Sequence, residues 1–293
     1  MLLYNIYLYY PVIFQRYYMN IFLAILYGII QGIAEFLPIS SSAHLAIAQN
    51  LFGMENVEAS HFTFDILLHL GTLVAVFIVY YKDIFALIPA AFSMLGKVFK
   101  GKFKLSDYNE NERFVIFVII ATLPLVAAVF VKDYIEALGS YTKIIGGILL
   151  FNGLVLFISD RLEKGTTNLS NAKPKHALFV GLCQMCAIVP GLSRSGSTIT
   201  GGLLMGFKRE LAVKFSFIMS IPAIIGANLL SVADVFENPI PSTDIIPYIA
   251  GTVTAAVVGV LAMKVLIYIS KKSNFRMFSY YCWAVGILAI IFG

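Results

Sequence analysis

The sequence predicts an all-α polytopic membrane protein with six transmembrane helices, two re-entrant helical hairpins and an inverted-topology internal repeat. Of its 293 residues, 59% are hydrophobic and only 13% are charged, and the mean hydropathy is +0.86. Soluble domains carry about a quarter charged residues, and a helix needs roughly 20 apolar residues to cross a bilayer. The apolar runs here are continuous, whereas a transmembrane β-barrel would show short alternating segments.

Six apolar segments have the length of transmembrane spans, and the charges of their connections orient them. They are residues 63–81, 114–131, 143–159, 211–231, 245–269 and 278–292. Lys and Arg gather in the connections 97–113, 160–176 and 270–277, whereas 53–62 and 233–244 contain acidic residues but no Lys or Arg. Because basic loops stay in the cytoplasm, both termini are expected outside. The net charge of +5 has the same explanation, and no nucleic-acid partner is predicted.

Two further apolar stretches, 21–52 and 177–207, are each broken near the middle by turn-forming residues. Pro38 interrupts the first stretch and Pro190–Gly191 interrupts the second. Non-helical backbone at membrane depth is tolerated only where protein or a wet cavity covers it. Both stretches are therefore predicted to be re-entrant hairpins, the first entering from outside and the second from the cytoplasm. Residues 82–96 are predicted to form an interfacial helix on the cytoplasmic side.

The two broken stretches resemble each other, which predicts an internal repeat. QGIAEFLPISSSAH from Gln31 aligns with QMCAIVPGLSRSGS from Gln184, and FDILLHLGTL aligns with FSFIMSIPAI further on. A first repeat of 19–159 and a second of 177–293 each contain one hairpin and three spans, within one integral membrane domain. Three crossings invert the second repeat, and in such folds the broken helices meet near the midplane to form the functional site. Residues 1–18 are expected to be an N-terminal extension.

The first break carries the polar side chains of a candidate reaction site. Glu35 follows Gln31 by four residues, so both side chains face the same way on a helix. Ser40, Ser41 and His44 come directly after the break. A glutamate buried among apolar groups needs a cation or an arginine partner to stay charged. Hydroxyls and a histidine are groups that nucleophilic and acid–base catalysis uses.

The second break, PGLSRSGST, places an arginine among hydroxyls and glycines. A charge at membrane depth is costly and is normally functional, and the planar guanidinium of Arg194 suits bidentate contact with phosphate. Glycines let backbone amides approach an anion, and a helix beginning near Ser197 would point its positive end at that anion. The pattern predicts a phosphate site. Its candidate binding residues are Gln31, Ser193, Arg194, Ser195, Gly196 and Thr198.

Structural explanations compete with these assignments. Serines and glycines in membrane helices often serve close helix packing, which would account for Ser42, Ser195 and Gly196. The arginine and the glutamate could likewise form a purely structural ion pair. Asp65 and His69, four residues apart at the head of a span, either line the site or form a hydrogen-bonded pair near the outer interface.

The two breaks also carry a family resemblance. QGIAEFLPISSSAH resembles the glutamate-rich signature, and PGLSRSGST the PGxSRSxxT signature, of the bacterial undecaprenyl-diphosphate phosphatases, also called the bacitracin-resistance family. The resemblance extends from Met19 to the C-terminus. It implies hydrolysis of the polyprenyl substrate undecaprenyl diphosphate to undecaprenyl phosphate and inorganic phosphate, which recycles the lipid carrier for cell-wall synthesis. It also implies a multi-pass protein of the bacterial plasma membrane, with an active site opening toward the outer face.

The resemblance also assigns roles to single residues. Its catalytic candidates are Glu35, Ser40, Ser41, His44 and Arg194, and Ser193 and Thr198 bind or react with phosphate. The family's first acidic position is Gln31 here, so a two-carboxylate metal site is not expected. A divalent cation, Mg²⁺ or Ca²⁺, would rely on Glu35 and on the diphosphate itself. Attack by a serine and a mechanism centred on His44 are both left open.

Other classes of membrane protein fit part of the pattern. A secondary transporter or lipid flippase would also use an inverted repeat with broken helices, and its anion site would lie at the same tips. A second class of membrane lipid phosphatases pairs Ser-Arg with a histidine six residues after the arginine, but Thr200 occupies that position. A role as a non-catalytic scaffold would not explain why Glu35, His44 and Arg194 are present. The oligomeric state is left open, with a homodimer as one option.

Overall fold

The computed structural model describes residues 19–51, 57–128, 130, 135, 141–162, 165–231, 240–271 and 275–293. Within them the backbone is helical apart from turns, loops and one isolated bridge between Thr167 and Phe207. The helices are α1 (Ile21–Phe36), α2 (Ser41–Leu51), α3 (Val57–Val79), α4 (Tyr81–Phe99), η1 (Leu105–Asp107), α5 (Glu110–Ala128), α7 (Thr142–Ser159), α8 (Pro174–Cys186), α9 (Arg194–Leu204), α10 (Arg209–Leu230), α12 (Ile245–Lys271) and α13 (Arg276–Phe292). The predicted extension 1–18 lies outside the described residues.

The lengths and surfaces of these helices are those of a membrane protein. Among the described residues, α5, α7, α10 and α12 are long and apolar enough to cross a bilayer, and α3 with α4 forms a fifth, sharply bent candidate. α1 and α13 are shorter apolar helices. Large apolar side chains such as Phe22, Ile246 and Phe292 are 72%, 69% and 80% exposed, a surface that water-soluble monomers rarely present. The prediction of an all-α polytopic membrane protein is confirmed.

Both stretches with a break in the sequence are pairs of helices in the structure. α1 ends at Phe36 and α2 begins at Ser41, so Leu37–Ser40 forms the first break. α8 ends at Cys186 and α9 begins at Arg194, which makes 187–193 the second break. The expected helix start near Ser197 is wrong, because α9 begins three residues earlier. The Ser193 hydroxyl accepts a hydrogen bond of 3.2 Å from the Gly196 N–H and caps the helix there.

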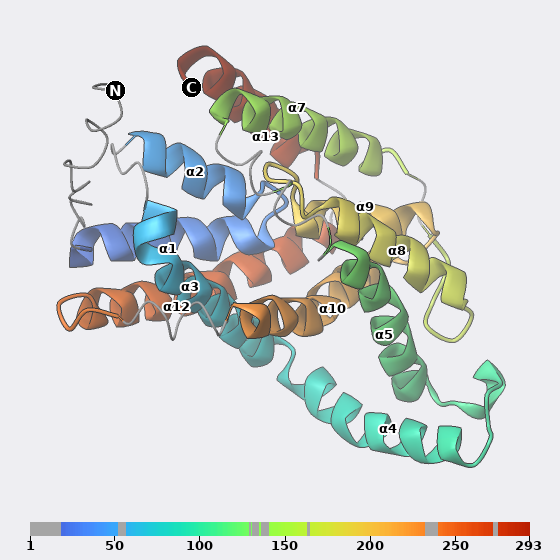
Figure 1. The fold of residues 1–293 in the computed structure, drawn as a ribbon. Coiled ribbons are helices and arrows are strands. Elements are labelled where there is room, and N and C mark those ends of the chain that lie inside the picture. Colours follow the sequence, from blue (N-terminus) through green and yellow to red (C-terminus); the bar gives the residue numbers. More distant parts are fainter. Residues whose placement is uncertain are drawn as a thin grey trace, which may run out of the picture.

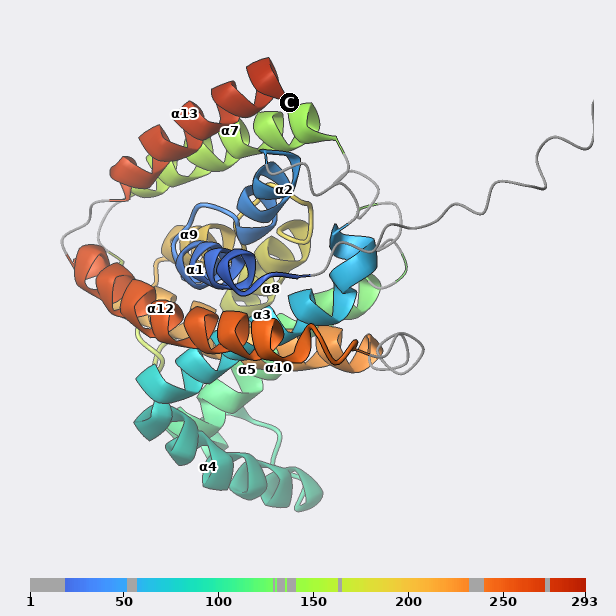
Figure 2. The same cartoon turned by 90° about the vertical axis from the view of Figure 1, so that its left-hand side faces the viewer.

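α1 lies near the middle of the molecule, and the two breaks meet beside it. α1 packs along α12, as Figures 1 and 2 show, while α7 pairs with α13. α2 and α9 each contact both α1 and α7. The second helix of each broken pair therefore lies between α1 on one side and the α7/α13 pair on the other, and each of them begins at a break.

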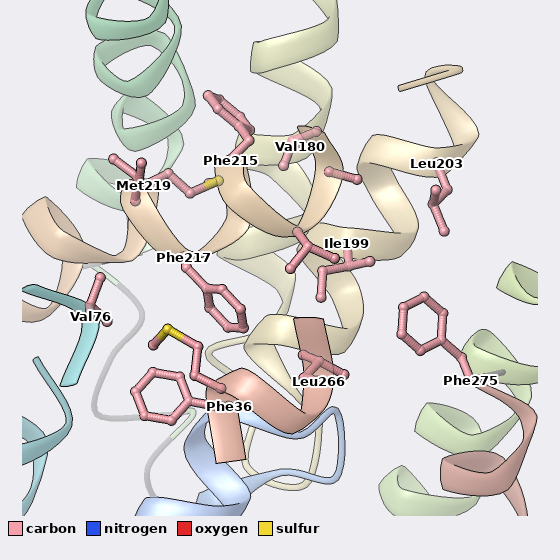
Figure 3. Packing of buried hydrophobic residues seen from close by; sticks show 14 of the residues in the cluster. Phe36, Val76, Val180, Ile199, Leu203, Phe215, Phe217, Met219, Leu266 and Phe275 are labelled. Carbon is pink, nitrogen blue, oxygen red and sulfur yellow. The ribbon is translucent and has the colours of Figure 1, made fainter. Parts of the chain in front are cut away.

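An apolar cluster anchors the end of α1. Figure 3 shows Phe36 from α1 next to Phe217 from α10, with Leu266 nearby. The Phe36 and Phe217 rings meet edge to face, with centroids 5.6 Å apart. Phe36 is fully buried and follows Glu35 directly. Its packing therefore holds the last turn of α1, and with it the glutamate, at the first break.

α4 turns away from α3 by 89° and extends from the main body, as Figure 1 shows. Its position is held by Glu112 of α5, which accepts hydrogen bonds of 2.7 Å from Ser93 and 2.6 Å from Lys97. An ion pair between Lys214 and Asp83 ties α4 to α10. Exposed phenylalanines, Phe85 and Phe92 among them, line its outer face. Residues 82–96 therefore lie within α4, and their interfacial placement stays a prediction.

Candidate active site

An ion pair joins the two breaks. Glu35 lies in the last turn of α1, and Arg194 is the first residue of α9, 159 positions further along the chain. The Arg194 Nη2 atom donates to Glu35 Oε1 at 2.5 Å, and the two side chains are only 18% and 7% exposed. A charge so poorly hydrated is stable only with a partner. The pairing that the sequence suggested is therefore present in the structure.

The second carboxylate oxygen of Glu35, Oε2, accepts hydrogen bonds from two neutral side chains. Ser41 donates its hydroxyl to Glu35 Oε2 at 2.9 Å, and the Gln31 amide donates to the same oxygen at 3.2 Å. Gln31 is completely buried, and its Oε1 atom has no hydrogen-bond partner within the described part of the chain. Gln31, Glu35, Ser41 and Arg194 thus form one network, with a hydroxyl held against a carboxylate.

Ser40 forms the tight turn between α1 and α2 that brings Ser41 back within hydrogen-bond distance of Glu35. Its φ of 73° lies in the left-handed region, which is unfavourable for any residue with a side chain. The Ser40 hydroxyl is buried, accepts from the Ala43 N–H at 3.3 Å and lies 3.2 Å from the Ser42 hydroxyl. Ser40 therefore caps α2, whereas Ser41 is partly exposed beside the carboxylate.

The second break approaches the first through Gly196. A side chain at Gly196 would meet Pro38, Leu156 and Ser193 at 3.2 to 3.3 Å. The Ser193 and Ser195 hydroxyls lie 3.1 Å apart, and both side chains are buried. Because the first amides of a helix have no intrahelical acceptor, the N-terminus of α9 brings amide donors and a partial positive charge to the junction.

Thr198 supports the first turn of α9. It is 1% exposed, and its hydroxyl donates to the Arg194 carbonyl at 2.8 Å and lies 2.6 Å from the Ser216 hydroxyl of α10. Its described contacts are therefore with the backbone that carries Arg194 and with the neighbouring helix.

Asn152 is a further residue at the junction, and the sequence reasoning missed it. Its amide nitrogen donates to the Pro38 carbonyl at 3.0 Å, and its oxygen accepts from the Ser193 N–H at 3.1 Å. Asn152 is completely buried on α7 and ties the first break to the second. The available signal was a lone amide in an otherwise apolar span, which is costly unless it is hydrogen-bonded.

His44 lies on α2, one turn beyond Ser40, and its two nitrogens are both engaged. Nδ1 lies 2.7 Å from the Ser40 carbonyl, and Nε2 lies 2.8 Å from the Tyr281 hydroxyl of α13. A carbonyl can only accept, so Nδ1 carries a hydrogen, and in the neutral ring Nε2 accepts from Tyr281. The described hydrogen bonds of His44 thus connect it to Ser40 and Tyr281 rather than to Glu35 or Arg194.

The site offers a metal ion a few oxygen atoms but no cluster of charged or imidazole ligands among the described residues. Across the described residues, no group of three or more His, Cys, Asp and Glu side chains is placed to hold one. Glu35 and the unpartnered Oε1 atom of Gln31 are hard oxygen ligands of the kind that Mg²⁺ and Ca²⁺ prefer. This set fits an ion that takes its remaining ligands from a substrate or from water.

These features describe an integral membrane protein with a candidate anion site where two broken helices meet. A family model described as bacitracin resistance protein BacA matches residues 24–288, and the chain belongs to this family. It is 41% identical to the undecaprenyl-diphosphatase of Methanobrevibacter smithii over 276 residues, which cover 93% of this chain and 98% of the relative. It is 42% identical to the undecaprenyl-diphosphatase of Alkaliphilus metalliredigens over 275 residues, covering 94% and 99% of the two chains.

Proposed function

We propose that this protein hydrolyses undecaprenyl diphosphate to undecaprenyl phosphate and inorganic phosphate, and so recycles the lipid carrier of cell-wall synthesis. The observation that carries this proposal is the network at the breaks, where Arg194 and the N-terminus of α9 face Glu35 and Ser41 inside a membrane protein. Relatives that share almost the whole chain are named undecaprenyl-diphosphatase, which supports it.

The diphosphate head group binds between the breaks in this proposal. The guanidinium of Arg194 and the first amides of α9 contact phosphate oxygens, as cationic forks and helix N-termini do elsewhere. The polyprenyl tail stays in the lipid, along the exposed apolar side chains of the helices.

Ser41 is the nucleophile that the geometry favours. Its hydroxyl already donates to Glu35 Oε2 at 2.9 Å, the arrangement of a nucleophile with its base. Glu35 accepts the proton as Ser41 Oγ bonds to the terminal phosphorus, and the anhydride P–O bond breaks to release the polyprenyl phosphate. Water then cleaves the Ser41 phosphate ester, which yields inorganic phosphate and restores the hydroxyl. Arg194 stabilises the charge on the phosphoryl oxygens throughout.

We also propose a divalent cation, Mg²⁺ or Ca²⁺, held by Glu35 and the Oε1 atom of Gln31 together with the diphosphate. When bound, such an ion neutralises charge on the phosphate oxygens. Glutamine contributes no charge, so the ion would depend on the substrate for affinity.

The proposed location is the bacterial plasma membrane, with the site open to the outer face. The basic side chains in the last turn of α4 and in the segment after it support this orientation, because such loops remain in the cytoplasm. They are Lys97, Lys100, Lys102 and Lys104.

The test is phosphate release from a polyprenyl diphosphate by the purified protein in detergent, with Mg²⁺ or with EDTA. We expect Arg194→Ala to lose roughly a hundredfold or more of the wild-type rate, because it removes the charge that binds and stabilises the phosphoryl group. Arg161→Ala, an exposed arginine stacked on Phe157 outside the site, is the matched control and should keep the wild-type rate. EDTA should lower the rate of the wild type.

No phosphate release from a well-folded wild type would contradict the hydrolase, and transport of the lipid by reconstituted protein would then favour the flippase. Equal rates for Arg194→Ala and Arg161→Ala would place the chemistry elsewhere.

A further inference from the structure

His69 of α3 reaches the same carboxylate that Arg194 binds. Its Nε2 atom lies 4.0 Å from Glu35 Oε2, whereas Arg194 contacts Oε1. The Nδ1 atom of His69 lies 3.0 Å from the Asp65 carbonyl oxygen and 3.5 Å from Asp65 Oδ2. The sequence left open whether these two residues line the site, and this contact places His69 beside it.

Asp65 fixes the orientation of the His69 ring. The Asp65 carbonyl oxygen can only accept, so Nδ1 carries the hydrogen of this 3.0 Å contact, and Asp65 Oδ2 lies nearby at 3.5 Å. The opposite nitrogen, Nε2, is then the one that faces Glu35. The ring lies between two carboxylates, with Asp65 Oδ2 3.5 Å from Nδ1 and Glu35 Oε2 4.0 Å from Nε2, and a ring that donates to a further oxygen carries hydrogen on both nitrogens. Asp65, one helical turn before His69, therefore acts on the site through His69.

The distance between His69 and Glu35 leaves both groups able to contact a ligand. At 4.0 Å they are beyond hydrogen-bond range, yet charges at this separation interact strongly where water is scarce. One phosphate oxygen could approach Nε2 from the site, because the His69 side chain is 31% exposed. The His69 side chain is thus partly exposed and makes no hydrogen bond to Glu35.

The charge balance of the site leaves room for a further donor of this kind beside the proposed cation. The single positive charge of Arg194 is offset by Glu35 at 2.5 Å. A diphosphate carries several negative charges, so an Arg–Glu pair alone would offer it a site of no net charge. The described ion pairs of Glu35 are with Arg194 and His69.

We propose that His69 is a further substrate-binding residue, whose Nε2 atom donates to a phosphate oxygen of the diphosphate, with Asp65 as the positioning residue behind it. The proposal rests on the proposed function and adds α3 to the elements that build the site. The binding group recognises the diphosphate itself and not the polyprenyl tail, so a soluble diphosphate should report on it.

The experiment compares wild type, His69→Ala, His69→Arg and Asp65→Asn. It measures KM and kcat for phosphate release, the Kd for inorganic pyrophosphate by calorimetry, and Tm. We expect His69→Ala to raise KM and Kd by roughly tenfold to a hundredfold, the value of a hydrogen bond to a charged group, with a smaller change in kcat. His69→Arg should recover much of the pyrophosphate affinity, and Asp65→Asn should lose less than His69→Ala. His176→Ala, on α8 against Phe207, is the matched control.

The outcomes separate this inference from the proposed hydrolysis. Wild-type KM and Kd in His69→Ala, with phosphate still released, would overturn the role of His69 and leave the hydrolase standing. If the wild type releases no phosphate, the hydrolase fails, while the pyrophosphate Kd still decides whether His69 binds the anion. If His69→Ala also has a lower Tm than the wild type, the His69→Arg variant decides. Recovery of pyrophosphate affinity in His69→Arg supports a binding role, whereas recovery of Tm without affinity shows a structural role.

Discussion

Glu35 is the residue on which the two breaks converge. It accepts from Arg194 on one oxygen and from Ser41 and Gln31 on the other. A buried carboxylate with this many donors is held in place, so its geometry toward the Ser41 hydroxyl is set before a substrate arrives. The neighbouring serine, Ser40, has a structural task instead, because it caps α2 in a strained conformation.

Alanine variants of the adjacent serines separate these roles. We expect Ser41→Ala to lower kcat by roughly a hundredfold or more with little change in Tm, because it removes the hydroxyl paired with Glu35. Ser40→Ala should mainly lower stability, by about 1 kcal/mol, because it removes a helix cap. Ser40→Gly is the control, since glycine accepts the positive φ without strain. The measurements are phosphate-release kinetics and Tm.

The reverse result, an inactive Ser40→Ala beside an active Ser41→Ala, would make Ser40 the nucleophile. If both serine variants stay active and His44→Ala does not, the mechanism centred on His44 holds.

Asn152 offers a second test at the residue scale. Asn152→Leu leaves the Pro38 carbonyl and the Ser193 N–H without their partner, at about 1–3 kcal/mol for each buried group. We expect a lower Tm and a loss of phosphate release, because the two breaks are no longer tied together. Asn168→Leu, an exposed asparagine in the loop before α8, is the control. An Asn152→Leu protein with wild-type Tm and rate would show that the breaks meet without this amide.

At the scale of the elements, α1 and α12 pack closely because small residues lie between them. A Cβ atom at Gly32 would lie 2.8 Å from the Ala255 carbonyl oxygen and 2.9 Å from both the Gly259 nitrogen and the Val258 side chain. Backbone cannot move away as a flexible side chain can. This contact sets the position of α1, and therefore of Gln31 and Glu35 in its last two turns.

Gly32→Ala should consequently push α1 away from α12. Overpacking of this kind costs about 1–3 kcal/mol, and we expect a lower Tm together with reduced phosphate release. Gly147→Ala on α7 is the matched control, because no atom lies within 4 Å of its added Cβ, and alanine favours the helix. Gly32→Ala with the Tm of Gly147→Ala would show that the helices can separate without cost.

At the scale of the whole molecule, the orientation in the membrane decides which side the site serves. Lys102, in the basic segment after α4, is expected in the cytoplasm, and Tyr141, before α7, is expected outside. Both side chains are exposed.

A labelling experiment tests this orientation. In a background without Cys183, Cys186 and Cys282, we expect a membrane-impermeant maleimide added to intact cells to label Tyr141→Cys but not Lys102→Cys. Permeabilised cells should show labelling of both and serve as the control. The opposite labelling pattern would show that the protein has the inverted orientation, with the candidate site on the inner face.

Much of the candidate site was visible in the sequence because its residues are exceptions to an apolar background. Glu35 and Arg194 are charges at membrane depth, and Pro38 and Pro190 mark where helices cannot continue. Asp65 and His69 could be assigned to one helix face, but not to the site. The start of α9 was misplaced, because a serine that caps a helix looks the same in sequence as a serine within a polar loop.

The sequence by itself determined the membrane-embedded helical class, the positions of the two breaks and the polar groups gathered there, because these depend on local composition and periodicity. Only the tertiary structure decided which groups meet: it established the suggested pair of Arg194 and Glu35 across 159 positions and added the contacts of Asn152 with both breaks and of His44 with Tyr281. Such contacts depend on how helices pack at long range. Local patterns do not specify that packing, since an apolar helix can face lipid or protein with the same sequence.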